Sequence, residues 1–327
     1  MKIAVIGSGS FGTAMAALFE KKGYVVSLWS FSNEEAQLLE STRKNVLLPD
    51  VILGKNISCT NSLQEATKDA KLIVTVVPSF ATRTTAKALS PFIKDNQPIV
   101  NLSKGLENNS LLRLSQVYKE EIPNARFAVL SGPSHAEEIG KNLPTTAVVA
   151  SEDKNTAKFV QDTIMDDNFR IYLSEDEIGV EIGGALKNVI ALCAGISDGL
   201  GYGDNTKAAL MTRGMAEITR IGVAMGAKSD TFFGLSGIGD LIVTCTSMHS
   251  RNRRCGILLG RGMGIDEAQK EIGMVVESIH TVEAAHLLGK KYGVSVPIID
   301  EAYNIVFKNK NPRLAARDLM KREKKTE

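Results

Sequence analysis

Cysteine and histidine are scarce in this sequence. Its 327 residues include four cysteines (Cys59, Cys193, Cys245 and Cys255) and four histidines, and no two cysteines form a C-x-x-C pair. Disulfide frameworks and zinc sites need closely spaced ligands of these types. We therefore expect four free thiols in a reducing compartment and no metal site.

The sequence also lacks an excess of charge of one sign. Its 39 Lys and Arg residues nearly balance 37 Asp and Glu residues, for a net charge of +2. This balance argues against a nucleic-acid or membrane-surface binder, although it allows a local basic cluster for a small anion. The sequence begins with a strand-like run, KIAVIG, and shows neither a signal peptide nor an apolar run that would span a bilayer. We predict a cytoplasmic protein with no nucleic-acid partner and no membrane insertion.

The first half alternates short apolar runs with amphipathic stretches. Strands are predicted at Lys2–Ile6, Val25–Trp29, Leu72–Val77, Pro98–Leu102, Phe127–Leu130 and Thr146–Ala150, and helices include Gly12–Lys22 and Asn109–Glu120. Continuous apolar strands separated by helices are typical of a parallel sheet covered on both faces. We predict a Rossmann-type α/β domain with a mostly parallel sheet over residues 1–174.

The pattern changes near Tyr172, after which the sequence is mostly helical in character. The stretch Glu177–Ser197 is long and apolar, which predicts a buried central helix. Further helices are predicted at Thr206–Met225, Thr281–Tyr292, Pro297–Phe307 and Pro312–Lys321. We therefore expect residues 175–327 to form a second, all-α domain.

Gly7, Gly9 and Gly12 form the pattern G-x-G-x-x-G between the first predicted strand and a predicted helix. In this context Gly7 permits a tight turn, Gly9 lets a pyrophosphate approach the backbone, and Gly12 lets the helix pack closely on the strand. Free N–H groups at the helix start would point at the phosphates. An ordinary glycine turn is the alternative, but the strand–turn–helix context favours a dinucleotide site.

The second predicted strand ends without a carboxylate. NAD-specific enzymes usually have Asp or Glu there, whereas this chain has Ser30, Phe31 and Ser32, and Glu34 is expected to begin the next helix. A 2′-phosphate would not be repelled, so NADPH is favoured as cofactor, with NADH as the alternative. Arg43 and Lys44 follow later, but nothing in the sequence supports them as partners of a 2′-phosphate.

Two polar segments follow later strands. Lys104 lies in NLSKGLE, and Gly132 and Ser134 lie in SGPSHA. Open α/β sheets bind ligands at the carboxyl ends of their strands, so Lys104 could reach a ligand, but a surface lysine at a helix start is an equally good interpretation. Ser134 could simply cap the following helix, or it could accompany backbone N–H groups that face a ligand.

Lys187 lies inside the apolar stretch EIGGALKNVIALCAG. A buried lysine is costly without a partner, and desolvation or a nearby positive nicotinamide ring would lower the pKa of its amine. Such a group suits proton exchange near neutral pH, which we favour over a lysine that extends to solvent. Gly183 and Gly184 weaken the helix, which indicates close packing at that point.

The densest group of polar residues is GLSGIGDLIVTCTSMHSRNRRCG. Asp240 and Thr244 are four residues apart and would share a helix face. The basic cluster from Ser250 to Arg254 suits a phosphate, which arginine binds as a fork, or else a solvated helix start. Glu277 in GMVVESIHT could contact a cofactor or pair with an arginine.

Together these motifs resemble the NAD(P)-dependent sn-glycerol-3-phosphate dehydrogenases of bacterial type. The matching elements are IGSGSFGTA, LSKG, SGPSHA, EIGGALKNVIALCAG, GLSGIGDLIVTCT with SRNRRCG, and VVES, in order from residue 6 to residue 278. The resemblance implies reversible conversion of dihydroxyacetone phosphate to sn-glycerol 3-phosphate, which supplies the glycerophospholipid backbone. The partner would be a small phosphorylated triose, and a homodimer is plausible.

The resemblance also implies roles for individual residues, with Lys187 matching the catalytic lysine. Substrate-binding positions are matched by Lys104, Gly132, Ser134, Lys187, Asp240, Ser250, Arg251 and Asn252. Cofactor-binding positions are matched by Gly7, Gly9, Ser10, Phe11, Gly12, Phe31, Lys104, Ala136, Arg251, Val275 and Glu277. Phe11 stands where the family often has Trp or Tyr, and Phe31 where it often has Arg or His.

Two other functions fit parts of the pattern. A β-hydroxyacid dehydrogenase also has a lysine on a central helix, but with an asparagine one turn later, where this chain has Ala191. A nucleotide-binding redox sensor would leave Lys187 and Arg251 without a purpose. We therefore expect Lys187 to donate a proton to the C2 oxygen of a triose while Arg251 and Asn252 hold its phosphate.

Overall fold

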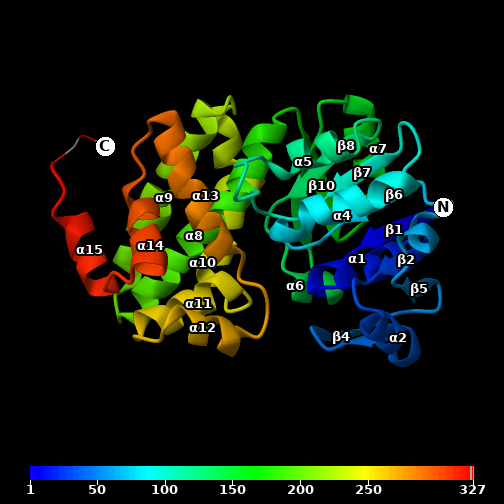
Figure 1. Cartoon of the computed structure of the whole chain (residues 1–327), viewed down its shortest axis with the longest axis horizontal. Coiled ribbons are helices and arrows are strands. Elements are labelled where there is room, and N and C mark those ends of the chain that lie inside the picture. Colours follow the sequence, from blue (N-terminus) through cyan, green and yellow to red (C-terminus); the bar gives the residue numbers. More distant parts are fainter. Residues whose placement is uncertain (325, 327) are drawn as a thin grey trace. The chain divides into compact units, whose positions relative to one another are not determined.

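The computed structural model describes residues 1–324 and residue 326, which fall into two units (Figure 1). The first comprises Met1–Glu107 and Leu112–Glu181, and the second Asn108–Leu111 and Ile182–Glu327. The units divide inside helix α8 (Glu177–Gly199), whereas the boundary predicted after residue 174 falls at the end of strand β10 (Phe169–Ser174).

The first unit is built on an eight-stranded sheet with the order β10-β9-β8-β7-β6-β1-β2-β5. Neighbouring strands are parallel except β8 and β9, so the predicted mostly parallel sheet is confirmed. The other strands of this sheet are β1 (Lys2–Ile6), β2 (Val25–Trp29), β5 (Ile57–Thr60), β6 (Leu72–Thr75), β7 (Pro98–Asn101), β8 (Arg126–Ser131) and β9 (Thr145–Ala150). A separate antiparallel pair is formed by β3 (Lys44–Asn45) and β4 (Leu48–Ile52).

Helices of the first unit pack on this sheet or on one another. They are α1 (Ser10–Lys21), α2 (Asn33–Thr42), α3 (Leu63–Thr67), α4 (Thr82–Leu89), α5 (Leu114–Glu121), α6 (Ala136–Gly140) and α7 (Lys154–Ile164). Ile3 and Val5, which share one face of β1, belong to a buried cluster with Met15 and Phe19 of α1. Burial of such a side chain contributes about 1.5–3 kcal/mol, so this contact fixes α1 against β1.

Strand β1 lies where the sheet reverses its order. The chain builds β2 and β5 on one side of β1 and then returns to build β6, β7 and β8 on the other. Open α/β sheets bind ligands at the carboxyl ends of the strands at such a switch point. The residues that follow β1 and β6 are therefore the expected position of a nucleotide.

The segment before α5 differs from the prediction. The sequence pattern predicts a helix over Asn109–Glu120, but α5 begins only at Leu114. Leu111 has a φ of +60°, and an isolated antiparallel bridge joins Leu106 to Arg113. A left-handed residue cannot continue a right-handed helix, so this segment forms a turn.

The second unit contains helices and no strand within its described residues, which confirms the all-α prediction. After α8 these are α9 (Asp204–Ala224), α10 (Asp240–Thr246), α11 (Arg251–Gly260), α12 (Ile265–Ile272), α13 (Glu277–Tyr292), α14 (Pro297–Lys308) and α15 (Pro312–Met320). A π-helical turn, Leu235–Gly239, leads directly into α10.

Helix α8 is a core helix, in which every residue from Gly179 to Ser197 is buried. Contrary to the sequence prediction, one helix among the described residues, α8, is long and apolar enough to cross a membrane. In its most apolar stretch, however, 89% of the residues are buried inside the protein. A helix that is apolar all round is typical of a protein core, so the predicted buried central helix is confirmed.

Candidate active site

The glycine loop after β1 has the geometry of a phosphate-binding turn. Gly7 has a φ of +122°, a conformation that other L residues rarely adopt. A Cβ atom at Gly12 would lie 1.9 Å from the carbonyl oxygen of Gly7, so only glycine allows this close approach. A Cβ atom at Gly9, the N-cap of α1, would meet no atom within 4 Å. Open space therefore lies beside the helix start that bears Ser10 and Phe11.

The charge of this loop suits an anion. The first turn of α1 contains no acidic residue, so its N–H groups and the positive end of the helix dipole can meet phosphate oxygens. Asn45 supports the loop, because its Nδ2 lies 2.6 Å from both the carbonyl oxygen of Ser8 and Oγ1 of Thr13. The residues present thus fit the pyrophosphate of a dinucleotide.

The end of β2 has a carboxylate nearby, contrary to the expectation from the sequence. Ser30 Oγ donates a hydrogen bond of 2.5 Å to Glu35 Oε2 in the first turn of α2. Phe31 is 86% exposed, and Arg43 is paired with Glu40 at 2.9 Å. The Glu35 carboxylate would repel a 2′-phosphate at Ser30 and could accept a hydrogen bond from a ribose hydroxyl. The preference for NADPH therefore stays a prediction.

Lys104 and Ser134 lie together after β7 and β8. Lys104 Nζ lies 2.9 Å from the carbonyl oxygen of Gly132 and 3.4 Å from Ser134 Oγ, which itself donates to the same carbonyl at 2.9 Å. Lys104 does not begin a helix, and Ser134 does not cap α6, whose N-cap is His135. Both structural alternatives from the sequence are therefore wrong. Lys104, Gly132 and Ser134 form one polar group. Its last member, Ser134, is two residues before Ala136, where α6 begins.

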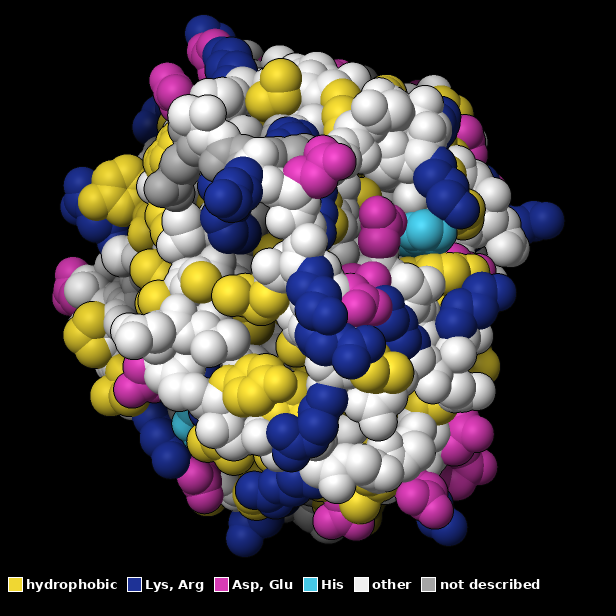
Figure 2. All heavy atoms as spheres, turned by 90° about the vertical axis from the view of Figure 1, so that its left-hand side faces the viewer, with side chains coloured by type: hydrophobic (Ala, Val, Ile, Leu, Met, Phe, Trp, Pro, Cys, Tyr) yellow, Lys and Arg dark blue, Asp and Glu magenta, His cyan; other side chains and the backbone are white. Residues whose placement is uncertain are grey.

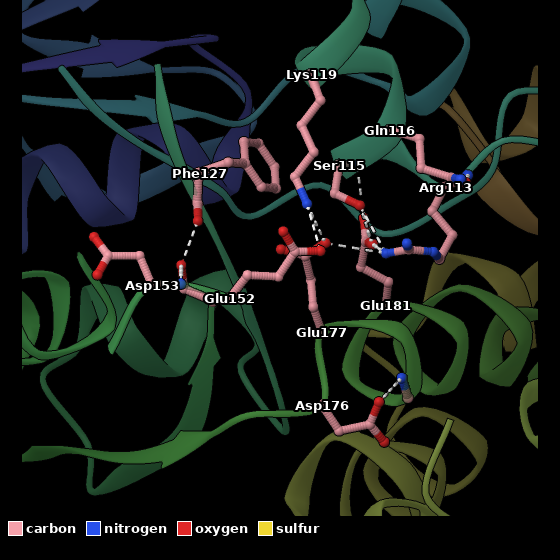
Figure 3. Close-up of polar contacts among 12 residues, drawn as sticks. Arg113, Ser115, Gln116, Lys119, Phe127, Glu152, Asp153, Asp176, Glu177 and Glu181 are labelled. Atoms are coloured by element: carbon pink, nitrogen blue, oxygen red, sulfur yellow. Dashed lines mark hydrogen bonds and ion pairs between the residues drawn. The ribbon is translucent and has the colours of Figure 1, made fainter. Parts of the chain in front are cut away.

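A buried ionic cluster at the start of α8 also lies in the first unit (Figure 3). Arg113 Nη1 lies 2.5 Å from Glu181 and 3.2 Å from Glu177, and Lys119 Nζ lies 3.0 Å from Glu177. Ser115 donates its N–H and its hydroxyl to Glu181, at 2.8 and 2.5 Å. Burial raises the pKa of Glu181, although Arg113 opposes this shift. The cluster ties α8 to α5, and its charged residues, far apart in the sequence, form no local pattern that would have indicated it.

In the second unit, Lys187 is buried between two polar partners. Its Nζ forms an ion pair with Asp240 and donates a hydrogen bond of 2.7 Å to Thr244 Oγ1. The side chains of Lys187 and Asp240 are 7% and 1% exposed, so the lysine does not extend to solvent. Asp240 and Thr244 share a face of α10, as the spacing predicts. In a low-dielectric interior these contacts are strong, so the ammonium group is held in one orientation.

Glycines on α8 let neighbouring backbones approach this helix closely. A Cβ atom at Gly183, one turn before Lys187, would lie 2.6 Å from the carbonyl oxygen of Ser236 in the π-helical turn. A Cβ atom at Gly195 would lie 2.1 Å from the carbonyl oxygen of Arg253 on α11. The close packing predicted at Gly183 is therefore confirmed, and it places α8 against the π-helical turn that leads into α10.

A second polar chain joins α8, α11 and α13. Asn252 Nδ2 donates a hydrogen bond of 2.9 Å to Asn188 Oδ1, and Asn252 Oδ1 accepts one of 2.9 Å from the N–H of Ser278. Asn188 directly follows Lys187, and Ser278 directly follows Glu277 at the start of α13. The amide of Asn252 therefore connects the helix of the buried lysine to the segment that contains Glu277.

Some residues of the basic cluster at the start of α11 stabilise the fold. Arg253 is paired with Asp198, with Nε and Nη2 at 2.9 and 2.7 Å. Ser250 caps α11, since its side chain accepts the N–H of Arg253 at 3.2 Å. Arg253 and Ser250 thus serve the fold, and the phosphate-binding role of Arg251 and Asn252 stays a prediction.

The predicted site residues fall into two groups, one in each unit. The first unit contains Gly7, Gly9, Ser10, Phe11, Gly12, Phe31, Lys104, Gly132, Ser134 and Ala136. The second contains Lys187, Asp240, Ser250, Arg251, Asn252, Val275 and Glu277. Within the described residues, no cluster of three or more His, Cys, Asp or Glu side chains could hold a metal ion.

Comparison with known proteins covers both units. The family model described as NAD-dependent glycerol-3-phosphate dehydrogenase N-terminus matches residues 2–157, and the corresponding C-terminus model matches residues 176–317. A glycerol-3-phosphate dehydrogenase (NAD(P)+) of Fusobacterium nucleatum is 53% identical over 330 residues, which cover 100% of this chain and 98% of that protein. A protein of the same description from Clostridium perfringens is 53% identical over 327 residues, with 100% and 99% covered.

Solved structures agree with the sequence matches. The crystal structure of glycerol-3-phosphate dehydrogenase from Coxiella burnetii has a TM-score of 0.95 and 35% sequence identity, and the match covers 98% of this chain and 99% of that one. The chain therefore belongs to the family of NAD(P)-dependent glycerol-3-phosphate dehydrogenases.

Proposed function

We propose that this chain catalyses the reversible NAD(P)H-dependent reduction of dihydroxyacetone phosphate to sn-glycerol 3-phosphate. In this proposal residues 1–174 bind the cofactor and residues 175–327 bind the substrate. The observation that carries the proposal is Lys187, which is buried and held by Asp240 and Thr244 in a full-length member of this family.

The chemistry follows from the position of the lysine. When bound, the reduced nicotinamide supplies the hydride that adds to the C2 carbonyl. Negative charge then develops on the C2 oxygen, where the ammonium group of Lys187 stabilises it and donates the proton that completes the alcohol. In the reverse direction Lys187 accepts this proton. Asp240 and Thr244 orient the amine.

The phosphate of the substrate is assigned to Arg251 and Asn252. Arginine binds a phosphate through a fork of N–H groups, and Asn252 is already fixed by Asn188 and by the backbone of Ser278. Contacts remote from the reacting carbon convert binding energy into orientation. In this proposal, Lys104 adds positive charge near both the substrate and the nicotinamide of the cofactor.

The proposed reaction also implies a cofactor and a cellular role. The glycine loop binds the pyrophosphate of NADH or NADPH. The absence of an acidic residue within β2 or directly after it, at Ser30 to Ser32, favours NADPH, whereas the Glu35 carboxylate, 2.5 Å from Ser30 Oγ, opposes a 2′-phosphate. The product would supply the glycerophospholipid backbone, with the enzyme acting in the cytoplasm.

The test follows the near-ultraviolet absorbance of the reduced cofactor with dihydroxyacetone phosphate, once with NADPH and once with NADH. We expect oxidation of the cofactor that depends on this substrate. Turnover of a 3-oxo acid with no turnover of dihydroxyacetone phosphate would instead indicate a β-hydroxyacid dehydrogenase. Cofactor binding without turnover of either substrate would indicate a nucleotide sensor.

A further inference from the structure

The second unit contains a large cavity that the proposed reaction does not use. Its volume is about 840 Å³, within the range of about 300–1,000 Å³ typical of small-molecule sites. It is lined by the C-terminal half of α8 and by α9, α14 and α15, together with residues that flank these helices. None of the residues assigned above to substrate or cofactor lines it.

The inner wall of this cavity is apolar. Residues of α8, α9, α14 and α15 contribute aliphatic side chains, namely Ile196, Leu210, Ile298, Ile305 and Leu319. Ile196 and Ile298 are buried, and the other three are half-buried. A cavity with this lining favours a hydrocarbon chain, because each buried CH₂ group contributes about 0.8 kcal/mol.

Arginines surround this apolar wall. Five arginines line the cavity, Arg213, Arg220, Arg313, Arg317 and Arg322, against three glutamates, Glu217, Glu301 and Glu323. All of these arginines except Arg220 are exposed, so they stand at the solvent side. Figure 2 shows the face of the molecule formed by α14, α15 and the C-terminal end, where Lys and Arg side chains gather beside hydrophobic ones.

Two of the glutamates already have partners within the protein. Glu301 is paired with Lys310 at 2.6 Å, and Glu217 accepts the backbone N–H groups of Ile298 and Ile299 at 2.9 to 3.1 Å. They therefore offset little of the positive charge at the solvent side, where Glu323 and the exposed Asp318, 3.8 Å from Arg317 Nε, offset part of it. The cavity is mostly apolar inside, although the buried side chain of Glu217 is part of its lining, and arginines outnumber glutamates at its edge.

We propose that this cavity binds a single-chain amphiphilic anion. The alkyl chain occupies the apolar interior, and the carboxylate or phosphate head group is held by the arginines of α15. Arg313 and Arg317 are four residues apart and share a face of this helix, so their guanidinium groups can bind one anion together. This charge complementarity distinguishes the occupant from an uncharged lipid.

Calorimetric titration with dodecanoate, dodecyl phosphate and dodecan-1-ol, each below its micelle-forming concentration, tests the proposal on the full chain. We expect both anions to bind in the micromolar range and the alcohol to bind at least about tenfold more weakly, a difference of about 1.4 kcal/mol. The tighter of the two anions identifies the head group. Failure of both anions to bind, or equal binding of the alcohol, would overturn the proposal.

Matched variants locate the binding site. Ala209 lines the cavity and its neighbour Ala208 does not, although both are exposed on α9. Ala209→Trp should lower the affinity for the bound anion by about tenfold or more, whereas Ala208→Trp should bind it as the wild type does. Equal effects of the two variants would contradict this location.

A second pair of variants tests the role of the arginines. The double variant Arg313→Ser/Arg317→Ser should lose most of its preference for the anions over the alcohol. The control Lys290→Ser/Lys291→Ser removes the same charge from α13, outside the cavity, and should keep that preference.

The oligomeric mass of the wild type and of Ala209→Trp is measured in parallel. If Ala209→Trp dissociates an oligomer and the wild type binds no anion, the cavity is a contact between copies of the chain and the proposal is wrong.

Discussion

At the residue scale, the proposed chemistry rests on a charged group at a position where charge is costly. Lys187 is tolerated there because Asp240 and Thr244 satisfy its amine. An isolated charge in such an interior would instead lose its proton. In the proposed reaction, the same two contacts that stabilise the lysine in the fold would also orient it for proton transfer, so stability and chemistry would depend on the same residues.

The carboxylate of Glu35 is the residue-scale feature that bears on cofactor choice. Because it lies 2.5 Å from Ser30 Oγ at the end of β2, Glu35→Gln should raise the kcat/KM for NADPH relative to NADH by about fivefold, which corresponds to about 1 kcal/mol of relieved repulsion. Steady-state kinetics with both cofactors measures this ratio. The control Glu152→Gln removes an exposed carboxylate elsewhere in the first unit. An unchanged ratio in Glu35→Gln would show that this carboxylate does not face the 2′ position.

At the scale of elements, α8 depends on glycines for its contact with α11. Replacement of glycine by alanine in a helix normally stabilises it by up to about 1 kcal/mol. Gly195→Ala should do the opposite and lower the free energy of unfolding by about 1–3 kcal/mol, because its Cβ atom would lie 2.1 Å from the carbonyl oxygen of Arg253. Urea denaturation measures the sign of the change. A more stable variant would contradict the close backbone contact.

The start of α8 depends on the ion cluster of Figure 3. Arg113→Ala should lower the free energy of unfolding by about 3–5 kcal/mol, because it leaves the buried carboxylate of Glu181 without its main partner. The double variant Arg113→Leu/Glu181→Leu should recover much of this loss. Lys154→Ala breaks an exposed pair with Glu175 and should leave the stability nearly unchanged. Equal effects of Arg113→Ala and Lys154→Ala would show that the cluster is not buried in solution.

Elements buried on both sides were predictable from the sequence, and those at edges were not. The strands β1 and β2 have the predicted bounds, because central strands of a parallel sheet are continuous apolar runs. β5 and β10 lie at the two edges of the sheet and mix polar with apolar residues, so no such run marked them. In the site, too, only some features are indicated by local sequence patterns. The glycine loop and Lys187 stand out locally, whereas the support of the loop by Asn45 depends on a chain return that no local pattern indicates.

At the scale of the whole molecule, one buried carboxylate makes stability depend on pH. Burial raises the pKa of Glu217 to about 7, although the N–H groups of Ile298 and Ile299, and Arg220, oppose this shift. A raised carboxyl pKa means that the folded state holds the proton more tightly. The contribution to stability is therefore fully present below the unfolded pKa of about 4.3 and is lost as the pH rises to about 7.

Glu217→Gln removes this titration. Between pH 4.5 and 7 the wild type should lose about 3 kcal/mol of unfolding free energy relative to the variant, because the other ionisable groups contribute equally to both proteins. Denaturant titrations of both proteins across this range measure the difference. Parallel stability curves would show that Glu217 titrates normally in the folded state.

The proton-donor role of Lys187 is tested most directly by measuring kcat and the cofactor Kd for Lys187→Ala. The account predicts that kcat for reduction of dihydroxyacetone phosphate falls by about 10²–10⁴-fold, while the Kd for NADPH, measured by its fluorescence, stays within a factor of about two of the wild type. Lys290→Ala, which removes an exposed lysine of α13, should keep full activity. A Lys187→Ala enzyme that retains wild-type kcat would contradict the account.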